Sequence, residues 1–283
     1  MSGIYFRQPT ANKNLSTVSG LNVVGAKFSK TTTFEVLRFL NGSRYTVLTK
    51  MLKMCGIRIK KDAEMMRVKL RVKGVLLDLD GTLVDSRDAY REAVEIAFKA
   101  LGWKTVPASV VLEIPRRLEL NLSINDLVDN MNVQRFLDLY LNAYYGATAT
   151  KTRLMPKIEG TLKRLSEKAV LALVTMRHVP KEKVTAELEN FGIAKFFRHV
   201  TTALDTSDPK PSPDALIKCA EKLGVQACEC LVVGDSVADV RAGKSAGAKT
   251  AAVLSGIFSR VELESEKPDL ILKSVNELPD FIE

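Results

Sequence analysis

Short apolar runs alternate with amphipathic stretches along the chain after residue 72. The first run, residues 74–77, leads into Asp78, and similar runs follow at 170–175, near Val200, and at 231–234, 250–254 and 270–272. Between and after them, apolar residues recur at helical spacing over 86–101, 157–167, 181–190, 213–223 and 237–246. Short runs bounded by turn residues are typical of strands buried on both faces of a sheet. The alternation predicts an α/β fold, in which helices cover both faces of a parallel sheet.

Residues 107–150 interrupt this alternation, because they show helical spacing without an intervening apolar run. The clearest helix is expected over 133–145, where Phe136, Leu137, Tyr140 and Tyr144 share one face. We interpret these aromatic side chains as the core of a separate helical unit. The sequence therefore predicts a helical insertion over 86–150 between two parts of one core, 72–85 and 151–283.

The N-terminal segment has a different composition from the rest. Residues 1–73 contain 15 Lys or Arg and 3 Asp or Glu, whereas the remaining residues contain 27 basic and 30 acidic side chains. The basic charge therefore does not indicate that the main domain binds nucleic acid. Residues 1–71 are interpreted as a basic extension, with 1–31 expected to be disordered and two short helices expected within 32–57.

This extension has several interpretations. It could tether the protein to nucleic acid or a membrane surface, act as a transit-type peptide, or form a small helix-turn-helix-like module. A translation start at Met65 or Met66 would remove it without loss to the predicted core. We favour this last interpretation, or an extension without function.

The composition further limits the class of protein to which this chain can belong. The chain has 283 residues, of which 46% are hydrophobic and 27% are charged, as in ordinary globular proteins. No run of about 18 apolar residues occurs, so no membrane-spanning helix is expected. Four cysteines are too few for a disulfide scaffold, which favours a reducing, cytoplasmic location. Because only two histidines occur, catalysis is expected to depend on carboxylates, hydroxyls and lysines.

Polar side chains directly follow three of the predicted strands. Asp78, Thr175 and Asp235 occupy these positions, and Lys210 lies in a loop of the same kind. Open parallel sheets bind ligands beyond the carboxyl ends of their strands. We therefore expect these side chains to meet in one crevice.

Two further carboxylates, Asp80 and Asp239, lie close to these positions in the sequence. Four carboxylates in one crevice cannot all stay ionised without a cation. A hard divalent ion with oxygen ligands, Mg²⁺, suits such a site. The hydroxyl of Thr175 and the ammonium of Lys210 could then hold a phosphoryl group. Since no Cys or His is placed to attack, a carboxylate is the natural nucleophile, and a second carboxyl two residues away can transfer protons.

Four motifs stand in a fixed order: Asp78-Leu79-Asp80-Gly81-Thr82, Leu173-Val174-Thr175, Lys210-Pro211-Ser212-Pro213 and Gly234-Asp235-Ser236-Val237-Ala238-Asp239. Together they resemble the haloacid dehalogenase (HAD) superfamily over about residues 72–283. The resemblance implies a Rossmann-like core, with Asp78 as nucleophile and Asp80 as general acid and base. It implies that Thr175 and Lys210 bind the phosphoryl group. It also implies that Mg²⁺ is held by Asp78, the backbone carbonyl of Asp80, and Asp235, with Asp239 in support.

The resemblance also indicates a branch of the superfamily. The dehalogenases lack an Asp at the position of Asp80, so its presence favours phosphoryl transfer. About 70 residues between Asp85 and Met155 match a helical cap inserted after the first motif. The pattern is most similar to the phosphoglycolate phosphatase and β-phosphoglucomutase branch. It implies a Mg²⁺-dependent phosphatase that hydrolyses a small phosphorylated metabolite, phosphoglycolate-like or a sugar phosphate, through an aspartyl-phosphate.

Two alternatives stay open: a phosphomutase that uses the same residues, and a non-enzymatic phospho-ligand sensor with a nucleic-acid-binding N-terminal module. The sequence does not indicate the oligomeric state.

One departure from the family is Met176-Arg177, where an Asn often follows the Thr. Arg177 is expected either to contact a substrate anion or to form a surface ion pair. Arg116 and Arg117, in the predicted cap, could likewise reach an acidic substrate or lie on a solvated helix face.

Overall fold

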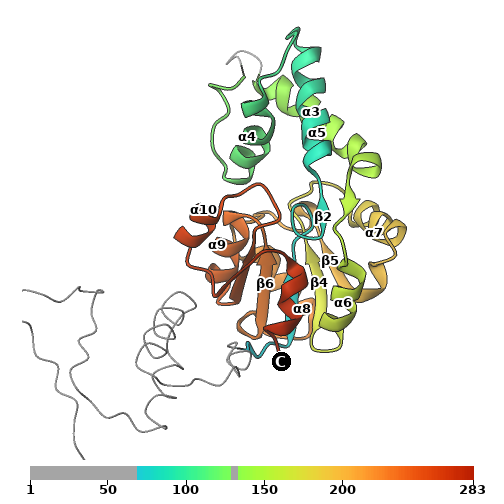
Figure 1. The fold of residues 1–283 in the computed structure, drawn as a ribbon, viewed down its shortest axis with the longest axis vertical. Coiled ribbons are helices and arrows are strands. Elements are labelled where there is room, and N and C mark those ends of the chain that lie inside the picture. Colours follow the sequence, from blue (N-terminus) through green and yellow to red (C-terminus); the bar gives the residue numbers. More distant parts are fainter. Residues whose placement is uncertain (1–68, 129–132) are drawn as a thin grey trace, which may run out of the picture. The chain divides into compact units, whose positions relative to one another are not determined.

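The computed structural model describes residues 69–128 and 133–283, and its centre is a six-stranded parallel sheet (Figure 1). The strand order is β5-β4-β1-β6-β7-β8. The strands are β1 (Gly74–Leu77), β4 (Val170–Val174), β5 (Phe197–Thr201), β6 (Cys230–Gly234), β7 (Lys249–Val253) and β8 (Leu270–Leu272). The predicted Rossmann-like α/β fold is confirmed. The strands predicted with bounds lie within one residue of them, and β5 contains Val200, near which a strand was expected.

Helices cover both faces of this sheet, and alternate residues of each strand contact different helices. Val75 and Leu77 pack in the cluster that contains Leu162 of α6, whereas Leu76 packs with Leu216 of α8. The helices outside the insertion are α6 (Ile158–Ser166), α7 (Lys181–Asn190), α8 (Asp214–Leu223), α9 (Val237–Ser245) and α10 (Arg260–Ser265). Short 3-10 turns are η3 (Ala194–Phe196), η4 (Ala203–Asp205), η5 (Ala227–Glu229) and η6 (Val275–Asp280). Burial on both faces explains why the strands are apolar without alternation.

Within its described part, the insertion, which we call the cap, contains three helices: α3 (Arg87–Ala100), α4 (Ala108–Glu119) and α5 (Val133–Lys151). They pack on one another around Phe98, Ile114 and Phe136, all fully buried. Helix α5 extends six residues beyond its predicted end at 145. In Figure 1 the cap stands above the carboxyl ends of the strands. The precise division between core and cap stays a prediction.

A feature not predicted is the antiparallel pair of two-residue strands β2 (Val84–Asp85) and β3 (Arg153–Leu154), where the chain enters and leaves the cap. Ser86 stands at the N-cap of α3, but its side chain does not cap the helix. Its hydroxyl donates instead to Asp80. A second difference is that α8 begins at Asp214, one residue later than the sequence indicated.

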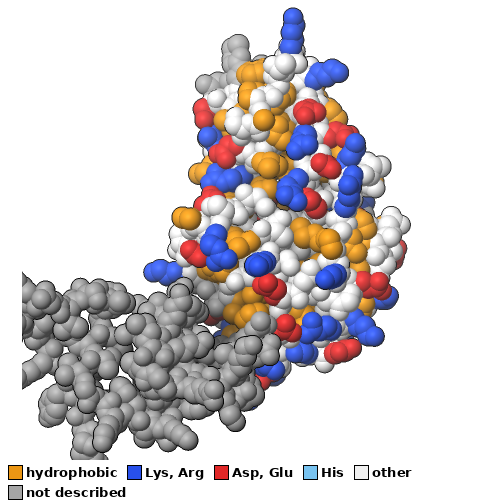
Figure 2. All heavy atoms as spheres, viewed as in Figure 1, with side chains coloured by type: hydrophobic (Ala, Val, Ile, Leu, Met, Phe, Trp, Pro, Cys, Tyr) orange, Lys and Arg blue, Asp and Glu red, His pale blue; other side chains and the backbone are white. Residues whose placement is uncertain are grey.

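Charged side chains of both signs are interspersed over the cap and the core on the face shown in Figure 2. This distribution agrees with the nearly equal numbers of basic and acidic side chains in the sequence after residue 73. No helix among the described residues is both long and apolar enough to cross a membrane. The disorder expected for 1–31 and the helices expected within 32–57 lie outside the described residues.

Candidate active site

Three adjacent strands place the predicted polar side chains together. Asp78, Thr175 and Asp235 directly follow β1, β4 and β6, and β1 lies between the other two. The backbone N–H of Asp78 donates to the carbonyl of Val233 over 2.9 Å, which continues the pairing of β1 with β6. The carboxyl ends therefore meet at the centre of the sheet, as the sequence predicted.

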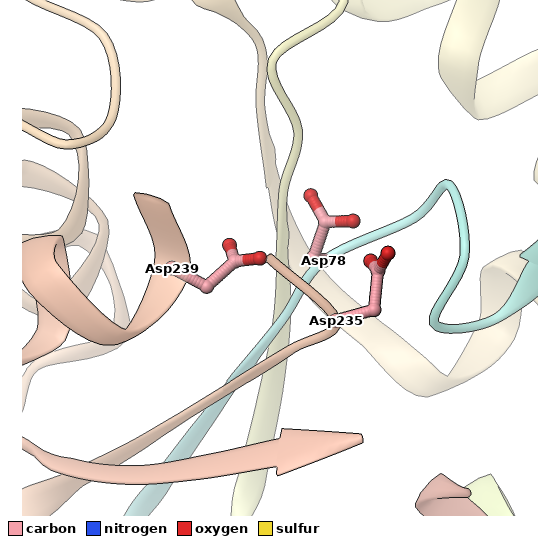
Figure 3. A group of neighbouring side chains, drawn as sticks. All are labelled: Asp78, Asp235 and Asp239. Carbon is pink, nitrogen blue, oxygen red and sulfur yellow. The ribbon is translucent and has the colours of Figure 1, made fainter. Parts of the chain in front are cut away.

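Three buried carboxylates converge at this point. One oxygen from each of Asp78, Asp235 and Asp239 lies within 4.8 Å of the others, with Asp239 projecting from α9 towards the two strand ends (Figure 3). Burial raises the pKa of Asp78 to about 7, although Lys210 acts to lower it. Burial and the charge of Asp78 raise the pKa of Asp235 well above its usual value. Crowded, desolvated oxygen ligands of this kind fit a hard divalent cation such as Mg²⁺.

Lys210 compensates two of these three charges. Its Nζ lies 2.7 Å from Oδ1 of Asp78 and 2.6 Å from Oδ1 of Asp239, and it also donates to the carbonyl of Val174 over 3.0 Å. Its side chain is only 2% exposed. Asp235 has no such cation among the described residues, and the one side-chain donor that its carboxylate meets there is the hydroxyl of Thr82, over 3.2 Å. Among the described residues, Asp235 is therefore the least compensated carboxylate of the three.

The backbone comes unusually close to Asp235. A Cβ added to Gly81 would lie 2.4 Å from the carboxylate of Asp235, and one added to Gly256 would lie 1.6 Å from it. Gly81 also has a φ of +77°, which other residues adopt only with strain. Both positions require glycine, because any side chain would displace the carboxylate.

Asp80 is held by a buried arginine. Nε and Nη2 of Arg177 each lie 2.7 Å from an oxygen of Asp80, and Nη1 of Arg177 pairs with Glu187. Burial acts to raise the pKa of Asp80, but Arg177 and the Ser86 hydroxyl lower it below its usual value. Arg177 is only 4% exposed, so its ion pairs are not the surface contacts that one interpretation of the sequence expected. Because two N–H groups of the planar guanidinium donate to the two oxygens of Asp80, Arg177 fixes the orientation of that carboxylate.

A cavity of about 220 Å³ lies between the core and the cap. Its core side is lined by Asp78, Asp80, Thr175, Met176, Arg177, His178, Lys210 and Ser236. Its cap side is lined by Tyr90, Pro115, Leu118, Glu119, Tyr140, Leu141, Tyr144 and Tyr145. The predicted phosphoryl-binding pair, Thr175 and Lys210, thus shares one cavity with both predicted catalytic carboxylates.

Arg116 and Arg117 do not line this cavity. Nε of Arg116 donates to Glu262 of α10 over 3.0 Å, and both arginines pair with Glu113. Arg117 also pairs with Asp126. Their contacts stabilise the cap and join it to the core, and nothing in this geometry directs them to a substrate.

Sequence reasoning missed three residues near the cavity. Tyr144 was assigned to the cap core, Glu119 was not singled out, and neither was Glu187, the second partner of Arg177. One signal existed for Glu187: it stands next to buried Leu188 and three residues after buried Val184. A carboxylate so close to an apolar face needs a cation.

Comparison with known proteins agrees with this geometry. The family model described as haloacid dehalogenase-like hydrolase matches residues 75–253, which is more than half of the chain. The chain belongs to the haloacid dehalogenase-like hydrolases. This hydrolase is 32% identical over 231 residues to the phosphoglycolate phosphatase of Escherichia coli K12, a match that covers 73% of this chain and 91% of the relative. It is 31% identical to the enzyme of that name from Vibrio parahaemolyticus, covering 75% and 96%.

Solved structures support the same assignment. A predicted phosphoglycolate phosphatase from Haemophilus somnus is 25% identical and superposes with a TM-score of 0.58, covering 74% of this hydrolase and 97% of that chain. The fold also matches a structure from Lactobacillus plantarum with a TM-score of 0.65, at 18% identity, covering 75% and 100%. With the family and the curated relatives in agreement, this hydrolase is a phosphatase.

Proposed function

We propose that this phosphatase hydrolyses a small phosphorylated metabolite with the help of Mg²⁺ and through an aspartyl-phosphate on Asp78. The observation that carries the proposal is the buried group of Asp78, Asp235 and Asp239, in which Lys210 pairs with Asp78 and Asp239, and in which Asp78 and Lys210 line a cavity between core and cap. Asp78, the backbone carbonyl of Asp80, and Asp235 would hold the ion, with Asp239 in support. When bound, Mg²⁺ would neutralise these carboxylates and polarise the phosphoryl oxygens.

The chain's own residues supply the remaining chemistry. Lys210 and the Thr175 hydroxyl bind oxygens of the phosphoryl group, and Asp78 attacks the phosphorus with one carboxylate oxygen. As that P–O bond forms, the bond to the leaving oxygen breaks, and the protonated form of Asp80 gives its proton to that oxygen. Because Arg177 favours the ionised form of Asp80 in the free protein, this step draws on the protonated minority. Asp80 then takes a proton from a water molecule, which attacks the phosphorus. The bond to Asp78 breaks, inorganic phosphate leaves, and both carboxyl groups return to their starting states.

Arg177 is a positioning residue in this scheme. Its two donors hold both oxygens of Asp80, while Glu187 holds the guanidinium from the other side. The curated relatives bear the name phosphoglycolate phosphatase, so 2-phosphoglycolate is the first metabolite to assay.

The test is the release of inorganic phosphate from 2-phosphoglycolate and from p-nitrophenyl phosphate in the presence of Mg²⁺. Asp78→Asn is expected to lower kcat by about 10³-fold or more, because an amide is a poor nucleophile. Asp208→Asn is the matched control, since Asp208 is exposed and outside the cavity. An Asp78→Asn variant that kept a tenth of the wild-type kcat would refute the covalent mechanism.

A further inference from the structure

The cap side of the cavity carries a carboxylate that is not used for folding. Glu119 ends α4 and lines the cavity opposite the catalytic residues. It is partly buried, and it forms no hydrogen bond or ion pair with any residue of the described ranges 69–128 and 133–283. A carboxylate kept in such a place is available to a ligand.

A second cap group has no hydrogen bond of normal geometry. The hydroxyl of Tyr144 is buried and lies beside the carboxylate of Asp80, but no hydrogen bond of normal geometry joins it to any described residue, although the side chain lines the cavity and is 5% exposed. An unpaired buried hydroxyl is costly and calls for an explanation. Burial and the charge of Asp80 raise the pKa of Tyr144 far above its usual value. The phenol therefore keeps its proton and can both donate and accept.

The tyrosine rings do not form a cage for a cation. Tyr90 stacks on Tyr144 with the ring centroids 5.0 Å apart and the planes at 14°. Tyr140 lies 6.2 Å from Tyr144 at 12°. A cage for a quaternary ammonium group turns several ring faces towards one point, whereas these faces are turned towards one another. A ligand in the cavity can therefore contact the edges and the hydroxyl groups of these rings, but not their faces.

The cavity also has no spare cation for an anionic leaving group. Lys210 contacts Asp78, Asp239 and the carbonyl of Val174, and the proposed function assigns it to the phosphoryl group. The pairs with Asp80 and Glu187 engage Arg177, the other buried basic side chain of the lining. His178, the third basic side chain of the lining, is exposed. A carboxylate on the leaving group would therefore face Glu119 without a compensating charge.

We infer that the cap selects a neutral, polyhydroxylated leaving group, as in a small sugar or polyol phosphate, with Glu119 and Tyr144 as its hydrogen-bond partners. A carboxylate accepts from two neighbouring hydroxyls, and the phenol supplies a further donor or acceptor. The volume of about 220 Å³ is below the roughly 300–1,000 Å³ of sites for drug-sized ligands, which favours a small metabolite. The inference rests on the proposed phosphatase function and names the substrate class of that site.

The experiment compares kcat/KM of the full chain with Mg²⁺ for erythrose 4-phosphate, ribose 5-phosphate, glycerol 3-phosphate, 2-phosphoglycolate and O-phosphoethanolamine. The wild type is expected to prefer at least one of the first three over 2-phosphoglycolate by about tenfold or more. Glu119→Gln removes the charge and keeps the shape, so it should shift this ratio towards 2-phosphoglycolate by about tenfold or more. Tyr144→Phe should lower the same ratio by removing the unpaired hydroxyl.

Glu95→Gln makes the same chemical change on the exposed face of α3, and it should leave the ratio unchanged. The inference is overturned if the wild type prefers 2-phosphoglycolate, or if Glu119→Gln leaves the ratio within about twofold. A preference for O-phosphoethanolamine would also overturn it, because Glu119 would then bind a cation. If no compound, p-nitrophenyl phosphate included, releases phosphate in a Mg²⁺-dependent way, the proposed function itself fails and the inference fails with it.

Discussion

Replacing Asp235 with Asn is expected to stabilise the metal-free protein while it destroys the metal site. Asp235 is 3% exposed and faces the charges of Asp78 and Asp239 without a cation of its own. Its only side-chain partner among the described residues is the hydroxyl of Thr82. Asn keeps the shape and an acceptor oxygen for this contact, but it removes the buried negative charge. The folded state should therefore gain stability when no divalent cation is present.

The neighbouring Asp78 gives the scale of this gain. Burial raises its pKa to about 7, roughly three units above the usual value of about 3.9, and each unit corresponds to about 1.36 kcal/mol. An ionised carboxylate of this kind costs the folded state about 4 kcal/mol at pH 8. We expect Asp235→Asn to recover about half of this, ~2 kcal/mol, because solvent and side chains relax around the charges. For a unit of this size, that is a rise in Tm of about 4–8 °C.

The sign of the pH dependence follows from the raised pKa values. A carboxylate whose pKa is higher in the folded state weakens folding at high pH, and the loss disappears as the pH falls towards its unfolded value near 4. The advantage of Asp235→Asn in EDTA should therefore be largest near pH 8 and should shrink towards pH 5. Thermal unfolding followed by circular dichroism measures it directly.

Adding Mg²⁺ should reverse the difference in thermal stability between the wild type and Asp235→Asn. The wild type should gain Tm as Mg²⁺ is titrated, because the ion binds only the folded state, whereas Asp235→Asn should respond far less. Asp208→Asn, an exposed control, should change stability by less than about 0.5 kcal/mol in either buffer. If Asp235→Asn melts below the wild type in EDTA at pH 8, the carboxylate group is not destabilising and our account of the site is wrong.

Four further results are expected. EDTA should abolish phosphate release and Mg²⁺ should restore it, whereas Ca²⁺ should not, because it takes a larger and looser oxygen shell; full activity in EDTA would contradict the metal assignment. Gly256→Ala should weaken the activation by Mg²⁺ about tenfold or more, because its methyl group would displace Asp235, and unchanged activation would contradict this. Arg177→Met should lower the free energy of unfolding in urea by about 3–5 kcal/mol, since it leaves the largely buried carboxylates of Asp80 and Glu187 without a cation; a loss below about 1 kcal/mol would argue against this role. A chain that starts at Met65 should keep the kcat of the full chain, because residues from Arg67 onward form one compact unit; an insoluble or inactive product would show that the preceding segment belongs to the fold.

Local sequence patterns were enough to predict the layout of the core. Buried strands such as β1 and β6 are continuous apolar runs, because both of their faces are covered by helices. The same patterns placed Asp78 and Asp235 at strand ends, and parallel strands bring their carboxyl ends to one edge. The convergence of Asp78, Asp235 and Asp239 thus follows from chain order and from the geometry of a parallel sheet.

Partners across the cap and the core were decided only by the tertiary structure. The period of an amphipathic helix tells which face is buried, but it does not tell what that face meets. Tyr144 has the periodicity of a core residue, yet its ring also borders the cavity. Arg116 pairs with Glu262, 146 positions away, and Arg177 pairs with Asp80, 97 positions away.

The first pair depends on how the cap sits on the sheet, and the second depends on β1 and β4 lying side by side; short-range spacing encodes neither. The same holds for Glu119, whose position at the end of α4 carried no signal in the sequence. It acquires its proposed role only because docking of the cap turns it towards Asp78 and Asp235 and leaves it without a partner among the described residues.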